Sequence, residues 1–412
     1  MENDWRSSNW GDEVTLEYGK AIRGYSQSHG KYRVFGSNGP IGWTSAALTQ
    51  GPGVVLGRKG AYRGVEFCRE PFWVIDTAYY IVPKTDLDMR WLYYAVKHYK
   101  LGEVDDGSPI PSTTRAAVYM LEFNVPPKHE QCAVAQILGT LDDRIELNRQ
   151  ANDTLEAMAR TLFKAWFVDF EPVRAKMEGR WQRGQSLPSL PAYLYDLFPE
   201  RLVESKLGEI PEGMEITSLS EYSSLNPESW TKRTRPEQIQ YVDLSKTKWG
   251  RIESATSYGA DDAPSRAQRI LRPLDTIVGT VRPGNGSYAL ISDEGLTGST
   301  GFAVLRPLRH ECSEFVYLAA TSRENIERLS NLADGGAYPA VRPEIVSATP
   351  VLRVGQELIN AFSRQVSPMF AGMADSERTS QSLAQLRDTL LPKLISGEMR
   401  VQDAERIVGV TI

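Results

Sequence analysis

Apolar positions recur along residues 134–166 in alternating steps of three and four, a spacing that places them on one face of a helix. The series is Val134, Leu138, Leu141, Ile145, Asn148, Asn152, Leu155, Ala159, Leu162 and Trp166. Two of its middle members, Asn148 and Asn152, are amides at positions where the seam of a coiled coil is normally dry. The pattern predicts a long coiled-coil helix with a polar centre.

The same spacing returns in the second half of the chain, in a register that aligns Asp106 with Asp334. The second series is Phe362, Val366, Met369, Met373, Ser376, Ser380, Leu383, Arg387, Leu390 and Leu394. Its polar pair, Ser376 and Ser380, occupies the same place as the two amides. Two helices that are apolar at both ends and polar in the middle are suited to antiparallel pairing.

In such a pair the polar centres meet, whereas a slipped register would bury an amide against leucine without a partner. The sequence therefore predicts that Asn148, Asn152, Ser376 and Ser380 fix the register of an internal helix pair. The alternative is that the two amides lie at the rim of a globular packing face.

An internal repeat extends beyond the helices. The stretch "DDGSPIPSTTR", which starts at Asp105, matches "ADGGAYPAVRP", which starts at Ala333. Upstream, "VVLGRKG" at 54–60 matches "VGTVRPG" at 278–284 in a slightly different register, which aligns Val54 with Val278. Each copy begins with short β-like runs punctuated by Gly, Pro, Asn and Ser, and ends in a long helix.

This organisation predicts an α+β protein with two β-rich blocks, joined by two long helices that form an antiparallel coiled coil with pseudo-two-fold symmetry. The expected boundaries are 1–128 for the first block, 129–170 for the first helix, 171–205 for a connector, 206–353 for the second block and 354–412 for the second helix and tail. Helices of roughly 35 residues are about 50 Å long. DNA readers with two-fold symmetry meet half-sites about 34–36 Å apart, so two unlike blocks on one chain suit two unlike half-sites.

Composition narrows the class of protein. The net charge is −5, which argues against a simple nucleic-acid binder and leaves local patches or partner subunits as sources of positive charge. The chain contains no uninterrupted apolar run of about 18 residues, and its N-terminus lacks the core of a signal peptide. Three scattered cysteines argue against a disulfide framework or a metal knuckle. A cytoplasmic protein is expected.

The run "QILGTLDDRIELNRQANDTLEAMARTLFKAWFVDFEPVRAKMEGR" strongly resembles the central conserved region of specificity subunits of type I restriction–modification systems. "LGEIPEGMEITSL" at 207–219 is similar to the start of their second target-recognition domain, and "LRDTLLPKLISGEMRV" at 386–401 to their distal helix. The segment "VLRVGQE" at 351–357 departs from the family pattern. The resemblance covers essentially the whole chain.

This resemblance implies a non-catalytic subunit whose two target-recognition domains read the halves of a split double-stranded DNA site. It implies that modification (methyltransferase) subunits dock on the helices and use S-adenosylmethionine. It also implies that restriction (endonuclease/translocase) subunits join them, with ATP and Mg bound by these partners. No cofactor or metal is expected on this chain, and no membrane partner.

A search for catalytic motifs supports the same view. The sequence contains no GxxxxGK[ST] loop, and no GxGxxG follows a predicted strand. The four histidines, His29, His98, His129 and His310, are far apart and lack HExxH spacing. Asp196 and the acidic "ESK" at 204–206 lie in the connector, where charged side chains are usually solvated.

Base readout requires donors and acceptors on loops held by a sheet, together with cations for phosphates. The candidates in the first block are Arg58, Lys59, Tyr62, Arg63, Thr113, Thr114 and Arg115, and those in the second are Lys232, Arg233, Arg282, Asn285, Tyr288, Tyr338 and Arg342. The repeat places Arg58 and Arg282 at matching positions. The alternative is that the cations are ordinary surface charges and the aromatics belong to the core.

Two other functions stay open from the sequence. An autonomous enzyme with a cryptic nuclease or methyltransferase site would be active as a purified chain, with Mg or S-adenosylmethionine. A repeat-built adaptor that binds only protein would tolerate charge reversal at Arg58 or Arg282.

Overall fold

The structure is a computed structural model and describes residues 4–25, 30–105, 107, 111–205, 208–231, 233–336 and 338–411. Asp106 and the candidate Lys232 lie outside these ranges. The chain divides into two compact units, and each is described by itself. Unit 1 comprises Met1–Asn148 with Arg378–Ile412, and unit 2 comprises Arg149–Glu377. The two long helices, α4 (Lys128–Phe167) and α9 (Gln356–Ile395), each contribute one half to each unit.

Unit 1 is built on an antiparallel four-stranded sheet in the order β2–β8–β5–β6. These strands are β2 (Val14–Tyr18), β8 (Ala78–Pro83), β5 (Gly53–Gly57) and β6 (Val65–Cys68). A second sheet has the order β4–β3–β7, with β4 (Gly39–Thr44), β3 (Tyr32–Gly36) and β7 (Phe72–Val74), and β3 is parallel to β7. A third pairing joins β1 (Arg6–Asn9) to β9 (Glu122–Val125).

Short helices complete unit 1. They are α1 (Trp10–Glu13), α2 (Met89–His98), the 3₁₀ turn η1 (Leu101–Glu103), α3 (Arg115–Tyr119) and the terminal α10 (Val401–Thr411). The Asp88 side chain accepts hydrogen bonds from the Arg90 and Trp91 amides, so it caps the start of α2. The core between sheet and helices contains the buried rings of Trp10, Trp91 and Tyr94.

Unit 2 repeats this plan. Its four-stranded sheet has the order β13–β22–β19–β20, with β13 (Ser223–Leu225), β22 (Phe302–Pro307), β19 (Thr276–Gly279) and β20 (Tyr288–Leu290). Its second sheet has the order β17–β14–β21–β18, with β17 (Thr256–Gly259), β14 (Gln238–Val242), β21 (Leu296–Ser299) and β18 (Ala267–Ile270). Here β14 and β21 are parallel, as β3 and β7 are in unit 1.

The remaining elements of unit 2 frame these sheets. Strand pairs join β12 (Glu215–Ser218) to β23 (Pro350–Arg353), β10 (Leu202–Ser205) to β11 (Gly208–Pro211) and β15 (Thr247–Lys248) to β16 (Arg251–Ile252). The helices are α5 (Glu171–Met177), α6 (Ser313–Ala320), α7 (Arg323–Leu332) and α8 (Pro343–Ser347). The 3₁₀ turns are η2 (Ala192–Leu197), η3 (Leu219–Glu221), η4 (Leu244–Lys246), η5 (Pro283–Asn285) and η6 (His310–Cys312).

The predicted repeat is confirmed in the strand order of the four-stranded sheet and in the parallel pair of the second sheet, which has three strands in unit 1 and four in unit 2. One part of its predicted register is wrong. In unit 1 Val54 pairs with Ile81, and in unit 2 Thr276 pairs with Leu305. Strand β5 therefore corresponds to β19 with Val54 in the place of Thr276, whereas the shared letters aligned Val54 with Val278. A slip of two positions keeps every side chain on the same face of a sheet, so the sequence pattern alone did not reveal it.

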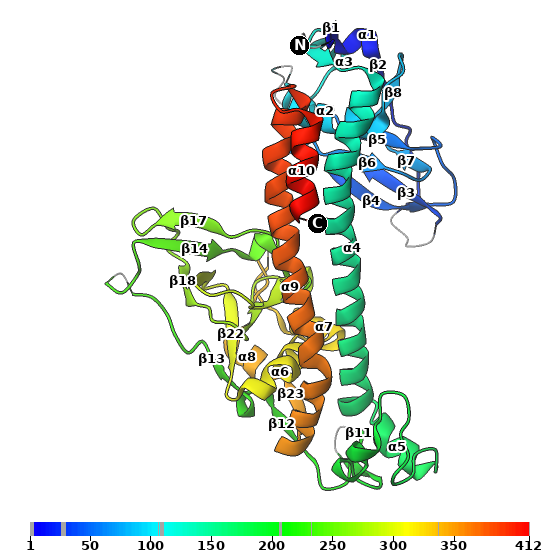
Figure 1. Cartoon of the computed structure of the whole chain (residues 1–412). Helices are drawn as coiled ribbons and strands as arrows, with labels where there is room; N and C mark the ends of the chain where they lie inside the picture. The colour runs from blue at the N-terminus through cyan, green and yellow to red at the C-terminus, as the bar shows by residue number, and fades with distance from the viewer. Residues whose placement is uncertain are drawn as a thin grey trace. The chain divides into compact units, whose positions relative to one another are not determined.

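The predicted antiparallel pairing of the long helices is confirmed within each unit (Figure 1). In unit 1 Asp142 contacts Arg387 and Asn148 contacts Ser380, so residue numbers rise along α4 as they fall along α9. In unit 2 Asn152 contacts Met373, and the rings of Trp166 and Phe362 lie 5.6 Å apart. The seam is buried as predicted, and its fully enclosed apolar members include Val134, Leu138, Leu141, Ala159, Trp166, Phe362, Val366, Leu383, Leu390 and Leu394.

The polar centre of the seam consists of side-chain and backbone hydrogen bonds. In unit 1 the Asn148 amide nitrogen donates to the Ser380 hydroxyl at 3.1 Å. In unit 2 the buried Asn152 donates to the backbone carbonyl of Met373 at 3.2 Å, while Ser376 is half-buried one turn further along α9. A buried amide is tolerated where it finds such acceptors. Whether these residues set the register stays a prediction.

The segment expected to be a connector is a folded part of unit 2. Its aromatic side chains, Trp181 and Phe198, are buried in the unit's core together with Leu194. The Lys176 ammonium donates to the Phe198 carbonyl at 2.6 Å and lies 3.9 Å from the centre of the Tyr195 ring. Gly, Pro and charge in this segment indicate a linker, but its large apolar side chains supply enough buried surface to fold.

We expect Asp142→Asn to destabilise unit 1. The Asp142 carboxylate accepts from Arg387 at 2.7 Å and from the hydroxyl of the buried Tyr94 at 2.6 Å. Burial, with the nearby Asp142 charge, raises the pKa of Tyr94, so the hydroxyl keeps its proton. Loss of the charge should lower the free energy of unfolding by about 1–3 kcal/mol in urea titrations followed by circular dichroism.

The matched control is Asp388→Asn, which removes the second carboxylate that contacts Arg387. The Asp388 side chain is 66% exposed, so its ion pair is screened by water and its loss should cost less than about 0.5 kcal/mol. Equal losses in the two variants would contradict a structural role for the half-buried pair.

Candidate nucleic-acid interface

The candidate residues of unit 1 lie on two loops that run side by side. The 57–64 loop follows β5, and the 111–114 loop precedes α3, whose first residue is Arg115. The Gly60 amide donates to the Pro111 carbonyl at 3.0 Å. Two further contacts join the loops, from the Thr113 amide to the Arg58 carbonyl and between Lys59 and Ser112. Residues far apart in the chain therefore form one surface beyond the end of β5.

Two guanidinium groups flank one aromatic ring on this surface. The Arg115 guanidinium lies 4.2 Å from the centre of the Tyr18 ring, and that of Arg58 lies 5.0 Å from it. The Tyr18 side chain is 45% exposed. Sequence analysis missed Tyr18 because it ends an ordinary alternating strand, and no nearby residue signals that β2 ends beside the two arginines.

Three other candidates of unit 1 have structural roles. The Arg63 guanidinium donates to the carbonyls of Gly60, Gly102 and Val104, so its donors are already engaged. Thr113 is buried and donates to the Val104 carbonyl at 3.0 Å. The Thr114 hydroxyl accepts from the Ala117 amide and caps α3. These contacts argue against base readout by Arg63, Thr113 and Thr114.

Lys59 and Tyr62 are on the surface of the same loop. The Tyr62 side chain is 80% exposed, which is unusual for a tyrosine in a β-rich unit. Lys59 is also exposed, beside the loop contact with Ser112. The core alternative is therefore wrong for Tyr62.

Unit 2 presents an equivalent pair of loops. The 280–288 loop follows β19, and the 338–342 loop precedes α8. The Arg282 amide donates to the Pro339 carbonyl at 2.7 Å, as Gly60 donates to Pro111 in unit 1. Arg282 therefore corresponds to Gly60 and not to Arg58, and the predicted match of the two arginines is wrong. Its φ of 46° is the left-handed conformation that glycine adopts in unit 1.

Exposed polar and aromatic side chains gather on this second loop pair. The Arg282 guanidinium lies 5.0 Å from the centre of the Tyr338 ring, whose side chain is 72% exposed. The backbone amide of Asn285 donates to the backbone carbonyl of Arg282 at 2.9 Å, and the Asn285 side chain is exposed. Arg342, also exposed, precedes α8. The backbone of this loop pair resembles that of the loop pair in unit 1, but the side chains on the two pairs differ.

The other candidates of unit 2 divide between core and surface. Tyr288 is buried and packs edge-on against Trp249 and Tyr317, so the core alternative holds for it and base contact by its ring is excluded in this conformation. Arg233 is exposed, whereas its neighbour Arg235 donates to the Ala260 and Ala267 carbonyls.

An ion-pair network anchors the chain at Glu228. The Glu228 carboxylate accepts from Arg272 at 2.6 and 2.8 Å and also from Arg306. Hydrogen bonds from Arg272 and then Arg306 lower the pKa of Glu228 to about 2. Arg306 also binds the buried Asp275 at 2.8 Å, so Glu228 is tied to the central sheet.

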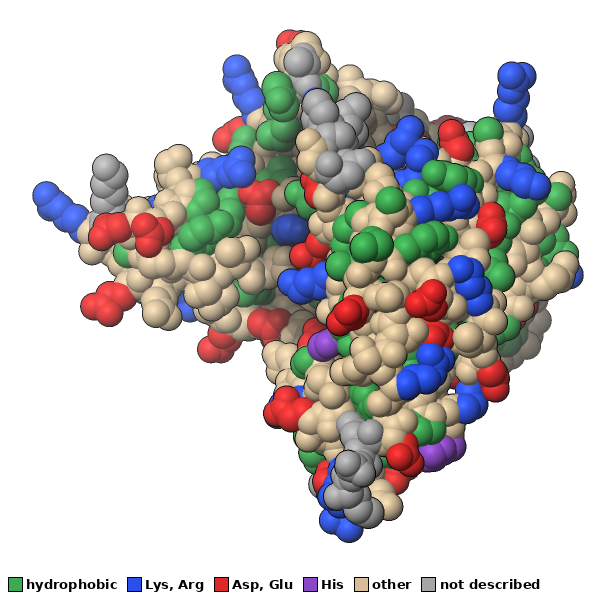
Figure 2. Space-filling view, turned by 90° about the horizontal axis from the view of Figure 1, so that it is seen from above, with side chains coloured by type: hydrophobic (Ala, Val, Ile, Leu, Met, Phe, Trp, Pro, Cys, Tyr) green, Lys and Arg blue, Asp and Glu red, His purple; other side chains and the backbone are tan. Residues whose placement is uncertain are grey.

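Charge is distributed over the surface in both signs. On the face that Figure 2 shows, Lys and Arg side chains are interspersed with Asp and Glu and do not form one broad basic patch. Within the described ranges, no group of three or more His, Cys, Asp or Glu residues is placed to hold a metal ion. None of the helices described there is long and apolar enough to span a bilayer.

We expect Glu228→Gln to reduce the acid sensitivity of unit 2. A carboxylate whose folded pKa is about 2 stabilises the fold above its ordinary pKa of 4.5, and this stabilisation is lost as pH falls from there toward 2. Wild type should lose about 1 kcal/mol more stability than Glu228→Gln between pH 5 and pH 2.5, because partial exposure screens the pair. Thermal melts across this range, with Glu237→Gln as an exposed control, measure the difference. Parallel pH curves for wild type and Glu228→Gln would rule the effect out.

The sequence is similar to a known family and to two known proteins. Residues 3–157 match the family model described as the type I restriction modification DNA specificity domain. The specificity subunit of the type I restriction enzyme HindI from Haemophilus influenzae is 25% identical over 343 residues, which cover 74% of each chain. The MjaIX specificity subunit from Methanocaldococcus jannaschii is 22% identical over 342 residues, or 78% of this chain and 72% of the relative.

A solved structure agrees at the level of the fold. The crystal structure of the type I restriction–modification system S subunit from M. genitalium aligns over 96% of both chains, with a TM-score of 0.54 and 18% identity. The fold, the repeated loop pairs, the family match and the two relatives agree with one another. In sequence and fold, the chain is similar to the specificity subunits of type I restriction–modification systems.

Proposed function

We propose that this chain binds double-stranded DNA sequence-specifically and that each unit reads one part of a bipartite site. The observation that carries the proposal is the repeated loop pair. Both units present two adjoining loops on the same sheet scaffold, joined by equivalent backbone hydrogen bonds. One scaffold used twice with different side chains suits two unlike half-sites.

The exposed side chains have the chemistry for base and backbone contact. Arginine forms bidentate hydrogen bonds with guanine, asparagine does so with adenine, and lysine binds phosphates. Unit 2 offers the exposed Arg282 and Asn285 on one short loop. In unit 1 Arg58 and Arg115 are half-buried around Tyr18 and donate to the carbonyls of Asp76 and Leu16, so the exposed candidates there are Lys59 and Tyr62. A net charge of −5 indicates that phosphate contact is local or shared with partner subunits.

We further propose that methylation and cleavage are carried out by partner subunits. Both relatives are named as specificity subunits of type I restriction enzymes, which supports a division of labour in this system. Modification subunits would bind S-adenosylmethionine, and restriction subunits would bind ATP and Mg. This chain would bind no cofactor and would direct the partners to the DNA site.

A methylation map tests the specificity role directly. Long-read sequencing of the host genome with and without this gene should show loss of methylated adenine at one split, asymmetric motif. The motif would report both half-sites at once. A host map with active modification that does not change on deletion of the gene would contradict the proposal.

Single loop substitutions should then relax one half of the motif. We expect Arg282→Ala to weaken discrimination at one base of the half-site read by unit 2, by about 1–3 kcal/mol or roughly 5- to 150-fold, with the other half unchanged. Arg183→Ala is the control, because Arg183 is 72% exposed in the 171–205 segment, outside both loops of unit 2. Unchanged discrimination in Arg282→Ala, or loss spread over both halves, would argue against readout by this loop.

A further inference from the structure

A two-residue turn in unit 2 has a tryptophan at a position where bulky side chains are disfavoured. Strands β15 and β16 pair Lys248 with Arg251, so Trp249 and Gly250 form the turn between them. Both turn residues have positive φ, 49° for Trp249 and 89° for Gly250. This is the geometry of a type I′ hairpin, whose first position favours Asn, Asp or Gly. A bulky residue there is strained by roughly 1–2 kcal/mol, and such strain concentrates at functional sites.

The surrounding structure holds the turn in place. The Trp249 amide donates to the Gly286 carbonyl at 2.6 Å, and the Gly250 amide donates to the Tyr288 carbonyl at 2.9 Å. At the base of the hairpin the buried Thr247 hydroxyl donates to the Asp243 carbonyl at 3.0 Å. The strained conformation is therefore held by backbone contacts, to which the indole adds its packing on Gly286 and its edge-on contact with Tyr288.

The indole covers one glycine and leaves most of its surface open. A Cβ atom at Gly286 would lie 2.6 Å from two ring carbons of Trp249, so the ring lies directly on that backbone. The Trp249 side chain is nevertheless 58% exposed. A tryptophan that served only the core would be largely enclosed, because exposure forfeits most of its hydrophobic stabilisation.

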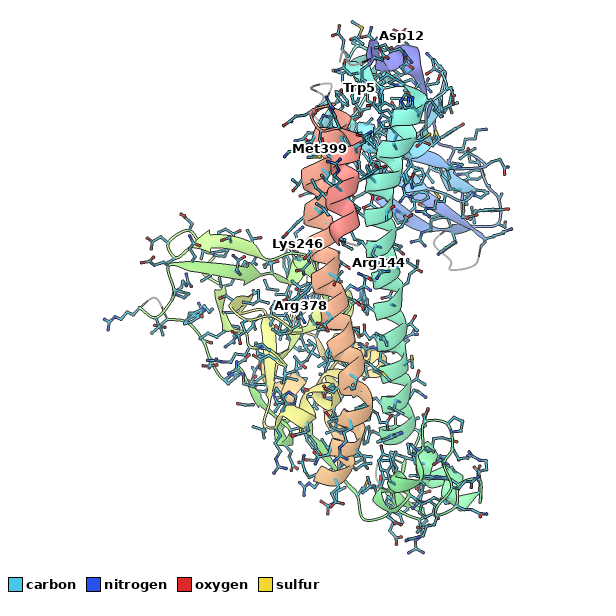
Figure 3. The ribbon with its side chains drawn as sticks, viewed as in Figure 1. Trp5, Asp12, Arg144, Lys246, Arg378 and Met399 are labelled. Carbon is cyan, nitrogen blue, oxygen red and sulfur yellow. The ribbon has the colours of Figure 1, made fainter. Side chains whose placement is uncertain are left out.

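The glycine under the indole belongs to the candidate DNA-binding loop. Gly286 directly follows Asn285, whose backbone amide donates to the Arg282 carbonyl. The Arg282 guanidinium lies 5.0 Å from the centre of the Tyr338 ring. Trp249 thus extends the exposed surface formed by Arg282, Asn285 and Tyr338. Lys248, which directly precedes Trp249, is exposed, as is Lys246 in η4, labelled in Figure 3. Arg251, at the other end of the turn, pairs with Asp153.

We propose that Trp249 is a DNA-contacting residue of unit 2. Its indole packs against the sugar of a nucleotide next to those reached from the Arg282 loop, and Lys248 lies toward the adjoining phosphate. Every nucleotide of a duplex presents a sugar and a phosphate, so such a contact strengthens binding with little preference among sequences. The assignment rests on the proposed function and adds to it a contact that gives affinity, beside the residues that discriminate bases.

The turn geometry supplies an unusually clean test. Trp249→Asn creates the Asn-Gly pair that type I′ hairpins prefer, so it removes the indole and should leave the melting temperature unchanged or raised. We expect the full chain, purified with its modification subunits, to bind a duplex carrying its methylation motif about 5- to 30-fold more weakly in this variant. The duplex with a scrambled motif should weaken by a similar factor.

Two further variants sharpen the comparison. Trp249→Phe keeps an aromatic ring on the turn and should bind within about threefold of wild type. Tyr193→Asn removes a side chain with the same 58% exposure from the 171–205 segment of unit 2, and its DNA affinity should equal that of wild type. Fluorescence anisotropy with labelled duplexes measures all four proteins.

The outcomes separate this inference from the proposed function. If wild type prefers its motif and Arg282→Ala relaxes it, but Trp249→Asn binds like wild type, then Trp249 does not contact DNA. Loss of modification subunits from the Trp249→Asn complex, with DNA affinity of the remaining chain intact, would assign the indole to a protein contact and overturn the inference. A wild-type complex with no motif preference would overturn the proposed function itself.

Discussion

The packing of α4 against α9 is the contact on which both units depend. Each hydrophobic core contains residues from the two helices, Leu138 with Leu390 in unit 1 and Trp166 with Phe362 in unit 2. Because the two helices come from different halves of the chain, each core is complete only when a segment distant in sequence has joined it. Closing so long a loop costs entropy, which the buried apolar seam must exceed.

The sequence predicted this framework well because its signals are periodic. Apolar residues spaced in steps of three and four over ten positions predict a helix with a buried face. The polar pair in the middle of both series predicts where the two helices meet. The repeat predicted the matching sheets for the same reason. A single residue such as Tyr18 carries no such redundancy, and its place between Arg58 and Arg115 follows only from the pairing of strands.

Prediction of the individual site residues was limited by the versatility of their side chains. An arginine on a loop can serve DNA or its own backbone, and Arg63 binds three carbonyls with donors that could otherwise reach phosphate. The match of Arg58 with Arg282 failed because Gly57 and Gly279 end the equivalent strands, and Arg282 lies two positions further into its loop than Arg58 does. The 171–205 segment was expected to be a connector because of its composition, but apolar residues including Trp181, Leu194 and Phe198 join the core of unit 2.

Unit 1 is built from the first and the last parts of the chain, so it cannot fold completely until synthesis is nearly finished. A ribosome that has reached residue 355 has completed the strands of both units but has made none of α9. Until that helix emerges, α4 contacts earlier residues such as Phe198 and Phe315, but the part of its apolar face that packs on α9 is uncovered, and unit 1 lacks its α9 residues. A premature stop anywhere before α9 would therefore leave both units without part of their core. It would yield a chain with an uncovered hydrophobic stripe, which is a substrate for chaperones and proteases.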